Sequence, residues 1–295
     1  MSEKSCIFAG VNIIEIMISC IICSRQPDIP AELKENISST IGCEYEVIVI
    51  DNSKNEYSIF SAYNEGVRRA KGDILCFMHE DILYHTDGWG EKISKILEDT
   101  TIGQIGVAGS HFMPKAPMYW WSSPYISQYN LETDNGVQKL NYTLDYSQGN
   151  LSDVVTVDGV CFFMRSDMFE VLRFDDVLYV DFHAYDMDIS MQVQNVGKRV
   201  CVTNEVLIEH FWSESLLLNQ SYMARLDKNL KIFFDKWQHL LPMKRGVDIP
   251  DIVFNRMNNL SVQAYDAKMA RQSKAYRLGK FLLHPSVCNL RRLFN

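Results

Sequence analysis

Three short polar groups in the N-terminal part of the sequence each follow an apolar segment directly. They are Ser24-Arg25, Asp51-Asn52-Ser53 and His79-Glu80-Asp81. In open α/β sheets, ligands bind beyond the carboxyl ends of the strands, which is where such groups would lie. Loops are polar in general, so one such group would mean little, but three in succession predict a binding site.

His79-Glu80-Asp81 carries side chains that can hold a divalent cation. In a strand, residues two positions apart point to the same side, so Asp81 and a second ligand two positions away can share one ion. Such an ion would bridge the oxygens of a diphosphate and neutralise charge developing on it. His210 follows another apolar segment. It either brings an imidazole to the same ion or is a hydrogen-bonded histidine at a strand terminus.

A further acidic group, Tyr185-Asp186-Met187-Asp188, opens a predicted helix. Acids in the first turn stabilise a helix through its dipole, which is the purely structural explanation. The chemical explanation makes Asp186 or Asp188 a general base that accepts a proton from a hydroxyl nucleophile. Spacing alone does not choose between the two acids. Asp51 could likewise accept a hydrogen bond from a nucleobase imide, or only close a turn.

Alternating strand and helix patterns must position these groups. Helical spacing between the apolar segments predicts helices that begin near Asp28 and at Ser58 and end at Gly42 and Gly72. Strands that are apolar on both faces and joined by single helices indicate right-handed βαβ units and a parallel sheet. The three expected strands lie at residues 15–25, 46–50 and 74–78.

Beyond residue 110 the pattern changes. Residues 111–150 are rich in aromatic side chains without clear periodicity, which predicts a long excursion over a cleft or a packed decoration. Trp120-Trp121 could stack on a sugar ring or belong to the core. The remaining elements expected are a strand region at 154–165, a helix from the acidic group to Asn195, one last strand at 199–208 and a helix from 214 to about 241.

Composition excludes several classes of protein. The 295 residues are 47% apolar and 22% charged, as in a globular protein with a buried core. With 29 Lys and Arg against 37 Asp and Glu, the net charge of -8 argues against binding to nucleic acid. No apolar run approaches the roughly 20 residues that span a bilayer, and no secretory signal is recognisable.

The eight cysteines are too few for a disulfide scaffold and most lie in apolar segments, which indicates small buried side chains in a reducing compartment. Cys20 and Cys23 form a CxxC pattern, but the period of two in a strand sends the two thiols to opposite faces. A metal or redox role for this pair is therefore not expected.

Together the motifs resemble glycosyltransferase family 2, the inverting enzymes with the GT-A fold, over about residues 16–240. The likeness is greatest to bacterial members that have a histidine in the metal-binding motif. The order and spacing of several segments carry the resemblance, and these are Cys23-Ser24-Arg25, residues 46–53 (EVIVIDNS), 62–66 (AYNEG), 70–73 (AKGD), 74–81 (ILCFMHED), Asp158-Gly159, Phe174-Asp175-Asp176, 185–189 (YDMDI), 197–200 (GKRV) and Glu209-His210.

This resemblance implies an α/β GT-A fold, with a mostly parallel central sheet flanked by helices and a C-terminal helical extension. Asp186 would be the catalytic base, and Asp81 and His210 would bind Mn²⁺ or Mg²⁺. His79 stands where the first Asp of the DxD motif usually lies, and Tyr185 replaces a usual Glu. Contacts to the nucleotide-sugar are expected from Ser24, Arg25, Asp51, His79 and Glu80.

The implied reaction moves a sugar from a nucleotide-sugar, most typically a UDP-sugar, to a hydroxyl of a glycan or lipid-linked acceptor. It would serve bacterial surface polysaccharide or glycan synthesis. Residues 1–245 would form the catalytic domain, with a donor half at about 16–110 and an acceptor half at about 150–245. This resemblance and the sequence together place the protein in the cytoplasm.

The extension at residues 246–295 is basic toward its end. Its segment 275–283 resembles C-terminal segments of membrane-associated bacterial glycosyltransferases. Leu278, Phe281 and Leu282 could share one helical face flanked by cations, the profile of an interfacial helix. The segment predicts either peripheral attachment to the inner face of the membrane or a plain packing helix.

Three other functions remain open from the sequence. A non-catalytic nucleotide- or carbohydrate-binding protein with the same fold would account for the departures at His79 and Tyr185. A sugar-phosphate nucleotidyltransferase would need a glycine-rich phosphate loop after the first strand, and residues 24–27 (SRQP) contain no glycine. A glycosidase would use two carboxylates but would leave the polar strand ends unexplained.

Overall fold

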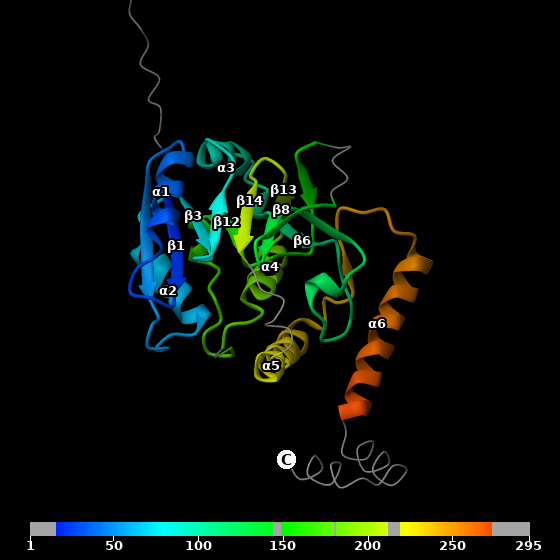
Figure 1. Cartoon of the computed structure of the whole chain (residues 1–295). Coiled ribbons are helices and arrows are strands. Elements are labelled where there is room, and N and C mark those ends of the chain that lie inside the picture. The colour runs from blue at the N-terminus through cyan, green and yellow to red at the C-terminus, as the bar shows by residue number, and fades with distance from the viewer. Residues whose placement is uncertain (1–15, 144–148, 180, 212–218, 273–295) are drawn as a thin grey trace, which may run out of the picture.

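A seven-stranded sheet forms the centre of the computed structural model (Figure 1), which describes residues 16–143, 149–179, 181–211 and 219–272. Its strand order is β10-β13-β5-β12-β3-β1-β2. Most strands point in one direction, and β12 and β10 run antiparallel to their neighbours. The strands are β1 (Ile18–Ser24), β2 (Tyr45–Asp51), β3 (Ile74–Met78), β5 (Ile102–Gly106), β10 (Leu151–Asp153), β12 (Cys161–Arg165) and β13 (Arg199–Thr203).

Helices cover both faces of this sheet because successive strand residues alternate between two hydrophobic cores. Ile21, Phe77 and Phe162 belong to one core, which α2, α4 and α5 also line. Ile22 and Phe163 belong to the other core, which α1 and α3 line. The helices are α1 (Ala31–Thr40), α2 (Ile59–Arg69), α3 (Trp89–Leu97), α4 (Tyr185–Asn195) and α5 (Gln220–Trp237). The predicted α/β class, with a mostly parallel sheet flanked by helices, is confirmed.

The predicted separation of the two CxxC thiols is also confirmed. Cys20 is buried in the core beneath α1 and α3, whereas Cys23 packs against the core on the opposite face. Both are free cysteines. The period of two in β1 therefore decides their environment, and the sequence spacing does not bring them together.

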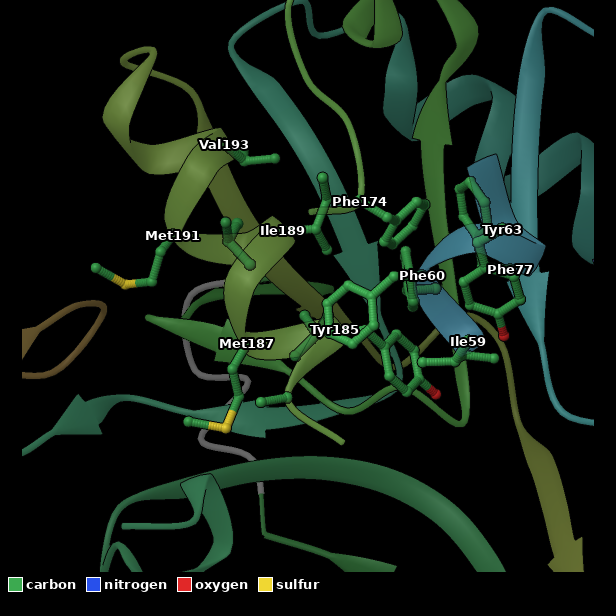
Figure 2. Close-up of a cluster of buried hydrophobic side chains, with 14 of the residues drawn as sticks. Ile59, Phe60, Tyr63, Phe77, Phe174, Tyr185, Met187, Ile189, Met191 and Val193 are labelled. Carbon is green, nitrogen blue, oxygen red and sulfur yellow. The ribbon is translucent and has the colours of Figure 1, made fainter. Parts of the chain in front are cut away.

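The core beneath α2 and α4 is dominated by aromatic rings (Figure 2). The ring centroid of Tyr63 on α2 lies 5.0 Å from that of Phe77 on β3 and 5.5 Å from that of Tyr185. Tyr185 is the first residue of α4, yet its side chain is only 4% exposed. The N-terminus of α4 is thus anchored in the core of the protein.

A second sheet, of order β11-β6-β8-β14-β4 with β9 paired to β8, lies beside the first. The prediction of one last strand at 199–208 is wrong, because a turn at Asn204 and Glu205 separates β13 from β14, which joins this second sheet. Its strands are β4 (Ile82–Tyr84), β6 (Ala108–Ser110), β8 (Ile126–Asp134), β9 (Val137–Tyr142), β11 (Thr156–Val157) and β14 (Ile208–Phe211). β7 (Phe112–Met113) pairs with β15 (Met243–Lys244).

The aromatic stretch at 111–150 contains regular structure that its sequence pattern does not predict. β8 and β9 form an antiparallel hairpin, and Asn135 and Gly136 at its tip have φ of 51° and 77°. Two successive positive φ angles are what a two-residue hairpin turn of type I′ requires. Of the adjacent tryptophans in the short 3₁₀ helix at Trp120–Ser122, Trp120 is 5% exposed and belongs to the core, whereas Trp121 is 43% exposed.

Local chemistry sets the ends of α2. Ser58 and Ser61 form a reciprocal capping box at its start. The helix ends with Ala70 in an extended conformation, so the prediction that Gly72 caps it is wrong. Gly72 instead lies against β1, where a Cβ would come within 2.7 Å of the backbone nitrogen of Ser19. The position therefore needs glycine for close approach of two backbone segments.

Two further helices complete the described chain. α5 begins after Asn219, whose side chain accepts hydrogen bonds from two N–H groups of the first turn; the predicted start at 214 lies outside the described residues. α6 (Asp251–Gln272) runs along the side of the molecule opposite β1 and α1 (Figure 1). Segment 275–283 also lies outside the described residues. Within the part that is described, no helix has both the length and the apolar character to cross a membrane.

Candidate metal centre and adjoining carboxylates

Asp81 and two histidines meet at the carboxyl end of β3. His79 follows β3 directly, Asp81 precedes β4, and His210 lies on β14 opposite Ile82 of β4. Oδ1 of Asp81 lies 3.7 Å from Nδ1 of His79 and 3.7 Å from Nε2 of His210. One ligand atom from each residue lies within 4.8 Å of the other two. The structure thus brings Asp81 and His210 together and adds His79 to the same group.

This group fits a divalent transition-metal ion by its chemistry. One carboxylate oxygen and two imidazole nitrogens form a mixed donor set, which suits Mn²⁺ better than Mg²⁺, an ion that prefers oxygen. Burial lowers the pKa of His79 to about 4, against the opposing influence of the Asp81 charge. The ring is therefore neutral at pH 7, and neutral imidazole is the form that binds metals.

Glu80, between His79 and Asp81 in the sequence, contacts the loop that follows β1. Its carboxylate accepts a hydrogen bond from Oγ of Ser24 at 2.5 Å and pairs with Nε of Arg25 at 3.1 Å. Arg25 is 82% exposed while Glu80 is 14% exposed. Glu80 therefore fixes the loop after β1 against the end of β3, and it leaves the guanidinium of Arg25 largely in solvent.

Asp51 lies at the carboxyl end of β2, directly opposite Ser24 in the parallel register. Its Oδ1 accepts a hydrogen bond from the backbone N–H of Ser53 at 2.9 Å. The side chain and backbone of Ser53 lower the pKa of this exposed carboxyl. Asp51, Ser24 and Glu80 thus form a continuous polar edge along β2, β1 and β3, next to the cation ligands.

Asp186 occupies the first turn of α4 and is fixed by two backbone groups. Its Oδ2 accepts from the N–H of Gly159 at 2.9 Å, and its Oδ1 accepts from the N–H of Met187 at 2.8 Å. Burial raises the pKa of Asp186 to about 6, although both hydrogen bonds oppose the shift. A carboxylate whose pKa lies this close to neutrality is a stronger base than an ordinary aspartate.

Asp158 is a site residue that reasoning from the sequence missed. Its Oδ1 accepts from the N–H of Val160 at 2.8 Å. Burial and, second to it, the charge of Asp186 raise the pKa of Asp158 to about 6, while the hydrogen bond from Val160 and the charge of His210 oppose the shift. Asp158 is therefore close enough to Asp186 and to His210 for the charge of each to affect its pKa. The sequence does contain a signal for Asp158: it follows an apolar segment directly, as the polar groups at the other strand ends do.

The two residues that depart from the family motif contact each other. Nε2 of His79 lies 2.9 Å from the hydroxyl oxygen of Tyr185. That hydroxyl also donates a hydrogen bond to the carbonyl oxygen of Gly159 at 3.0 Å. Tyr185 thus links the cation ligands to the segment that holds Asp186.

Asp188 does not face this site. Its side chain is 1% exposed and accepts hydrogen bonds from Trp237 Nε1 at 2.8 Å and Tyr179 Oη at 3.2 Å, and its Oδ1 lies 2.9 Å from Nζ of Lys236. The sequence spacing did not decide whether Asp186 or Asp188 is the candidate base. In the structure Asp188 is buried among structural partners, so Asp186 remains the candidate.

The chain thus has an α/β fold with a mostly parallel central sheet, and candidate cation ligands and buried acids lie beyond its strand ends. The family model described as "Glycosyltransferase like family" matches residues 17–237, and the chain belongs to that family. No curated protein sequence matches the chain.

Two solved structures are similar to the chain at low identity. One is described as the crystal structure of GalNAc-T7 with UDP, GalNAc and Mn²⁺, with 12% identity, a TM-score of 0.48 and coverage of 91% of this chain. The chain spans 58% of the length of that protein. The other is A197 from STIV, with 12% identity and a TM-score of 0.39, over 67% of this chain and 86% of that one.

Proposed function

We propose that the protein is a metal-dependent, inverting glycosyltransferase that moves a sugar from a nucleotide-sugar to an acceptor hydroxyl. The observation that carries this proposal is the convergence of Asp81, His79 and His210, with the buried acids Asp158 and Asp186 close by, in a chain of a glycosyltransferase-like family. A UDP-sugar is the donor that we would test first.

Asp186 is the base in this proposal. Its carboxylate takes the proton from the acceptor hydroxyl, whose oxygen then attacks the anomeric carbon from the face opposite the leaving nucleoside diphosphate. The hydrogen bonds from the N–H groups of Gly159 and Met187 hold the carboxylate in one orientation, so little reorganisation is needed for proton transfer. A single displacement of this kind inverts the configuration at the anomeric carbon.

His79, Asp81 and His210 would hold Mn²⁺ or Mg²⁺. When bound, such an ion supplies positive charge that stabilises the departing diphosphate. Asp51 and the loop at Ser24 and Arg25 lie along the adjoining strand ends, where they would contact the base and sugar of the nucleotide. Glu80 acts on this loop through its bonds to Ser24 and Arg25.

Residues 16–110 would form the donor half and residues 150–245 the acceptor half of the catalytic domain. We further propose a role in bacterial surface polysaccharide or glycan synthesis, with a glycan or lipid-linked acceptor at the cytoplasmic face of the membrane. The support is the basic segment 275–283 of the C-terminal extension. Anionic vesicles should sediment the full chain better than a chain ending at Gln272; equal sedimentation would refute membrane attachment by this segment.

The function is tested with a panel of nucleoside diphosphate sugars in the presence of Mn²⁺. At least one donor should release its nucleoside diphosphate slowly by transfer to water, and faster once an acceptor is found. If nucleoside diphosphates bind but no donor of the panel turns over, the alternative of a non-catalytic binding protein replaces this proposal. The departures at His79 and Tyr185 are the features that this alternative would invoke.

A further inference from the structure

We infer that the hydroxyl of Tyr185 fixes the tautomer of His79, so that Nε2 carries the hydrogen and Nδ1 presents its lone pair to the cation. Tyr185 is thereby a positioning residue for a metal ligand, which it does not itself supply. The assignment of the hydrogen depends only on the geometry of the protein; the part about the cation rests on the proposed function.

A count of hydrogens around Tyr185 gives the tautomer. A phenol has one hydrogen to donate, and the carbonyl oxygen of Gly159, 3.0 Å away, can only accept. Two oxygen atoms at this distance need a hydrogen between them, and only Tyr185 can supply it, so the hydrogen of Tyr185 points to Gly159. The hydroxyl oxygen can then only accept from Nε2 of His79, 2.9 Å away, so Nε2 must be protonated.

The other ring nitrogen agrees with this assignment. Nδ1 of His79 lies 3.7 Å from Oδ1 of Asp81, which is too long for a hydrogen bond. A hydrogen on Nδ1 would find no acceptor in that contact, whereas a hydrogen on Nε2 has one at 2.9 Å. Because a neutral imidazole carries one ring hydrogen, Nδ1 is left as the free acceptor, and it faces Asp81 and the cation position.

Tyr185 is held firmly enough to impose this choice. Its ring is 4% exposed, and its centroid lies 5.5 Å from that of Tyr63 and 6.3 Å from that of Phe60. At Gly159, a Cβ would come within 2.2 Å of the Tyr185 hydroxyl oxygen. Gly159 therefore has two roles: the absence of a Cβ leaves space for the Tyr185 hydroxyl, and its carbonyl oxygen accepts the hydrogen of that hydroxyl.

Ligating histidines commonly donate their second ring N–H to a fixed acceptor, which orients the ring, and loss of such a partner costs about 10- to 100-fold in metal affinity. A tyrosine oxygen that itself donates to a carbonyl is such an acceptor, strengthened because the two hydrogen bonds polarise each other. The two departures from the family motif thus form one unit: a histidine ligand and the hydroxyl that orients it.

The tautomer is measured in the metal-free protein labelled with ¹⁵N, by long-range ¹H–¹⁵N correlation of the imidazole rings. The His79 signals are assigned by their loss in His79→Gln. We expect the Nε2–H form in the wild type and a mixture of the two tautomers in Tyr185→Phe. As the control, Tyr84→Phe removes a buried hydroxyl from the core on the other face of the central sheet, where it contacts Cys76 and Cys161, and it should leave the His79 signals unchanged.

Titration with Mn²⁺, followed by calorimetry, tests the consequence for the ion. Tyr185→Phe should weaken Mn²⁺ binding about 10-fold, and Tyr84→Phe should stay within about twofold of the wild type. Gly159→Ala, in which a Cβ displaces the hydroxyl, should reproduce the tautomer mixture of Tyr185→Phe. Far-UV circular dichroism and thermal unfolding establish that each variant is folded.

An Nδ1–H tautomer in the wild type, or a Tyr185→Phe protein with unchanged tautomer and unchanged Mn²⁺ affinity, would overturn the inference. Failure of the wild type to bind Mn²⁺ at all would overturn the proposed metal dependence and the ligand role of His79. These failures are distinguishable, because the tautomer is read without metal.

Discussion

The ammonium group of Lys236 on α5 lies 2.9 Å from Oδ1 of Asp188 on α4, and the Asp188 side chain is 1% exposed. Lys236 also pairs with Asp175 at 2.8 Å, in the loop that precedes α4. The same Asp188 carboxylate accepts a hydrogen bond from Trp237. A buried ion pair therefore ties α5 and the preceding loop to α4, the helix whose first turn carries Asp186.

Replacing Lys236 by methionine should destabilise the protein strongly. Methionine keeps much of the packing but leaves the Asp188 carboxylate buried without its cation, which costs about 3 kcal/mol in the free energy of unfolding. Urea denaturation followed by circular dichroism measures this value.

The matched control for that substitution is Lys231→Met on the same helix. Lys231 pairs with Asp235 at 3.0 Å, but the two side chains are 64% and 54% exposed. Exposed pairs of this kind contribute little, so we expect a change below about 0.5 kcal/mol. Equal effects of the two substitutions would show that the buried pair is not a brace between α4 and α5.

The sequence predicts the parallel half of the sheet well because its strands are apolar on both faces and end in polar groups. β9 cannot be predicted in this way, because most of its side chains are exposed. Its apolar residues Val137 and Leu140 are among the exposed ones, so they do not form the alternating pattern of a half-buried strand. The Asn135-Gly136 pair is the local signal that identifies the hairpin. The break between β13 and β14 depends on pairing with β8 and β4, which no local pattern reveals.

The candidate site likewise has a part that the sequence predicts and a part that only the structure reveals. Strand ends place Ser24, Asp51 and Asp81 at one edge, and this follows from the βαβ pattern alone. The contact between His79 and Tyr185 joins residues 106 positions apart and needs the packed core to define it. In the sequence, Tyr185 appears only as the loss of the usual Glu from an acidic motif. In the structure, its hydroxyl contacts His79, a candidate metal ligand.

Asp186→Asn should lower transfer about a thousandfold, because an amide cannot take the proton of the acceptor hydroxyl. Binding of Mn²⁺ and nucleoside diphosphate should persist, since Asp186 is outside the group of cation ligands. Initial rates of nucleoside diphosphate release and calorimetry measure the two properties separately. Asp235→Asn, at an exposed position on α5, is the control, and loss of both properties in Asp186→Asn would contradict the assignment.

Asp81→Ala should weaken metal-dependent nucleotide binding by at least about tenfold. Its oxygen is the donor that lies 3.7 Å from both histidine nitrogens, so its removal leaves two imidazoles without an anionic partner. Calorimetric titration with UDP, with and without Mn²⁺, provides the measurement. Asp87→Ala, at a nearby exposed position, should behave as the wild type. Removal of metal by a chelator should abolish transfer by the wild type, and transfer that survives chelation would exclude a metal-dependent reaction.

The activity should depend on pH through Asp186. Burial raises its pKa to about 6, and only the ionised form accepts a proton. The value of kcat/KM should therefore be constant above about pH 7 and fall tenfold per pH unit well below 6. Because the raised pKa makes the folded chain bind more protons than the unfolded chain between about pH 4 and 6, this group also lowers stability as pH rises through that window.

Asp158→Asn should move this acid limb to lower pH. The charge of Asp186 raises the pKa of Asp158, and such repulsion is mutual, so removing the Asp158 charge favours ionisation of Asp186 and lowers its apparent pKa. The pH profile of kcat/KM for wild type and variant measures the shift, with Asp167→Asn as control because that side chain is 64% exposed. An acid limb that stays at about pH 6 in Asp158→Asn would mean that burial alone sets the pKa of the base and that the two acids act independently.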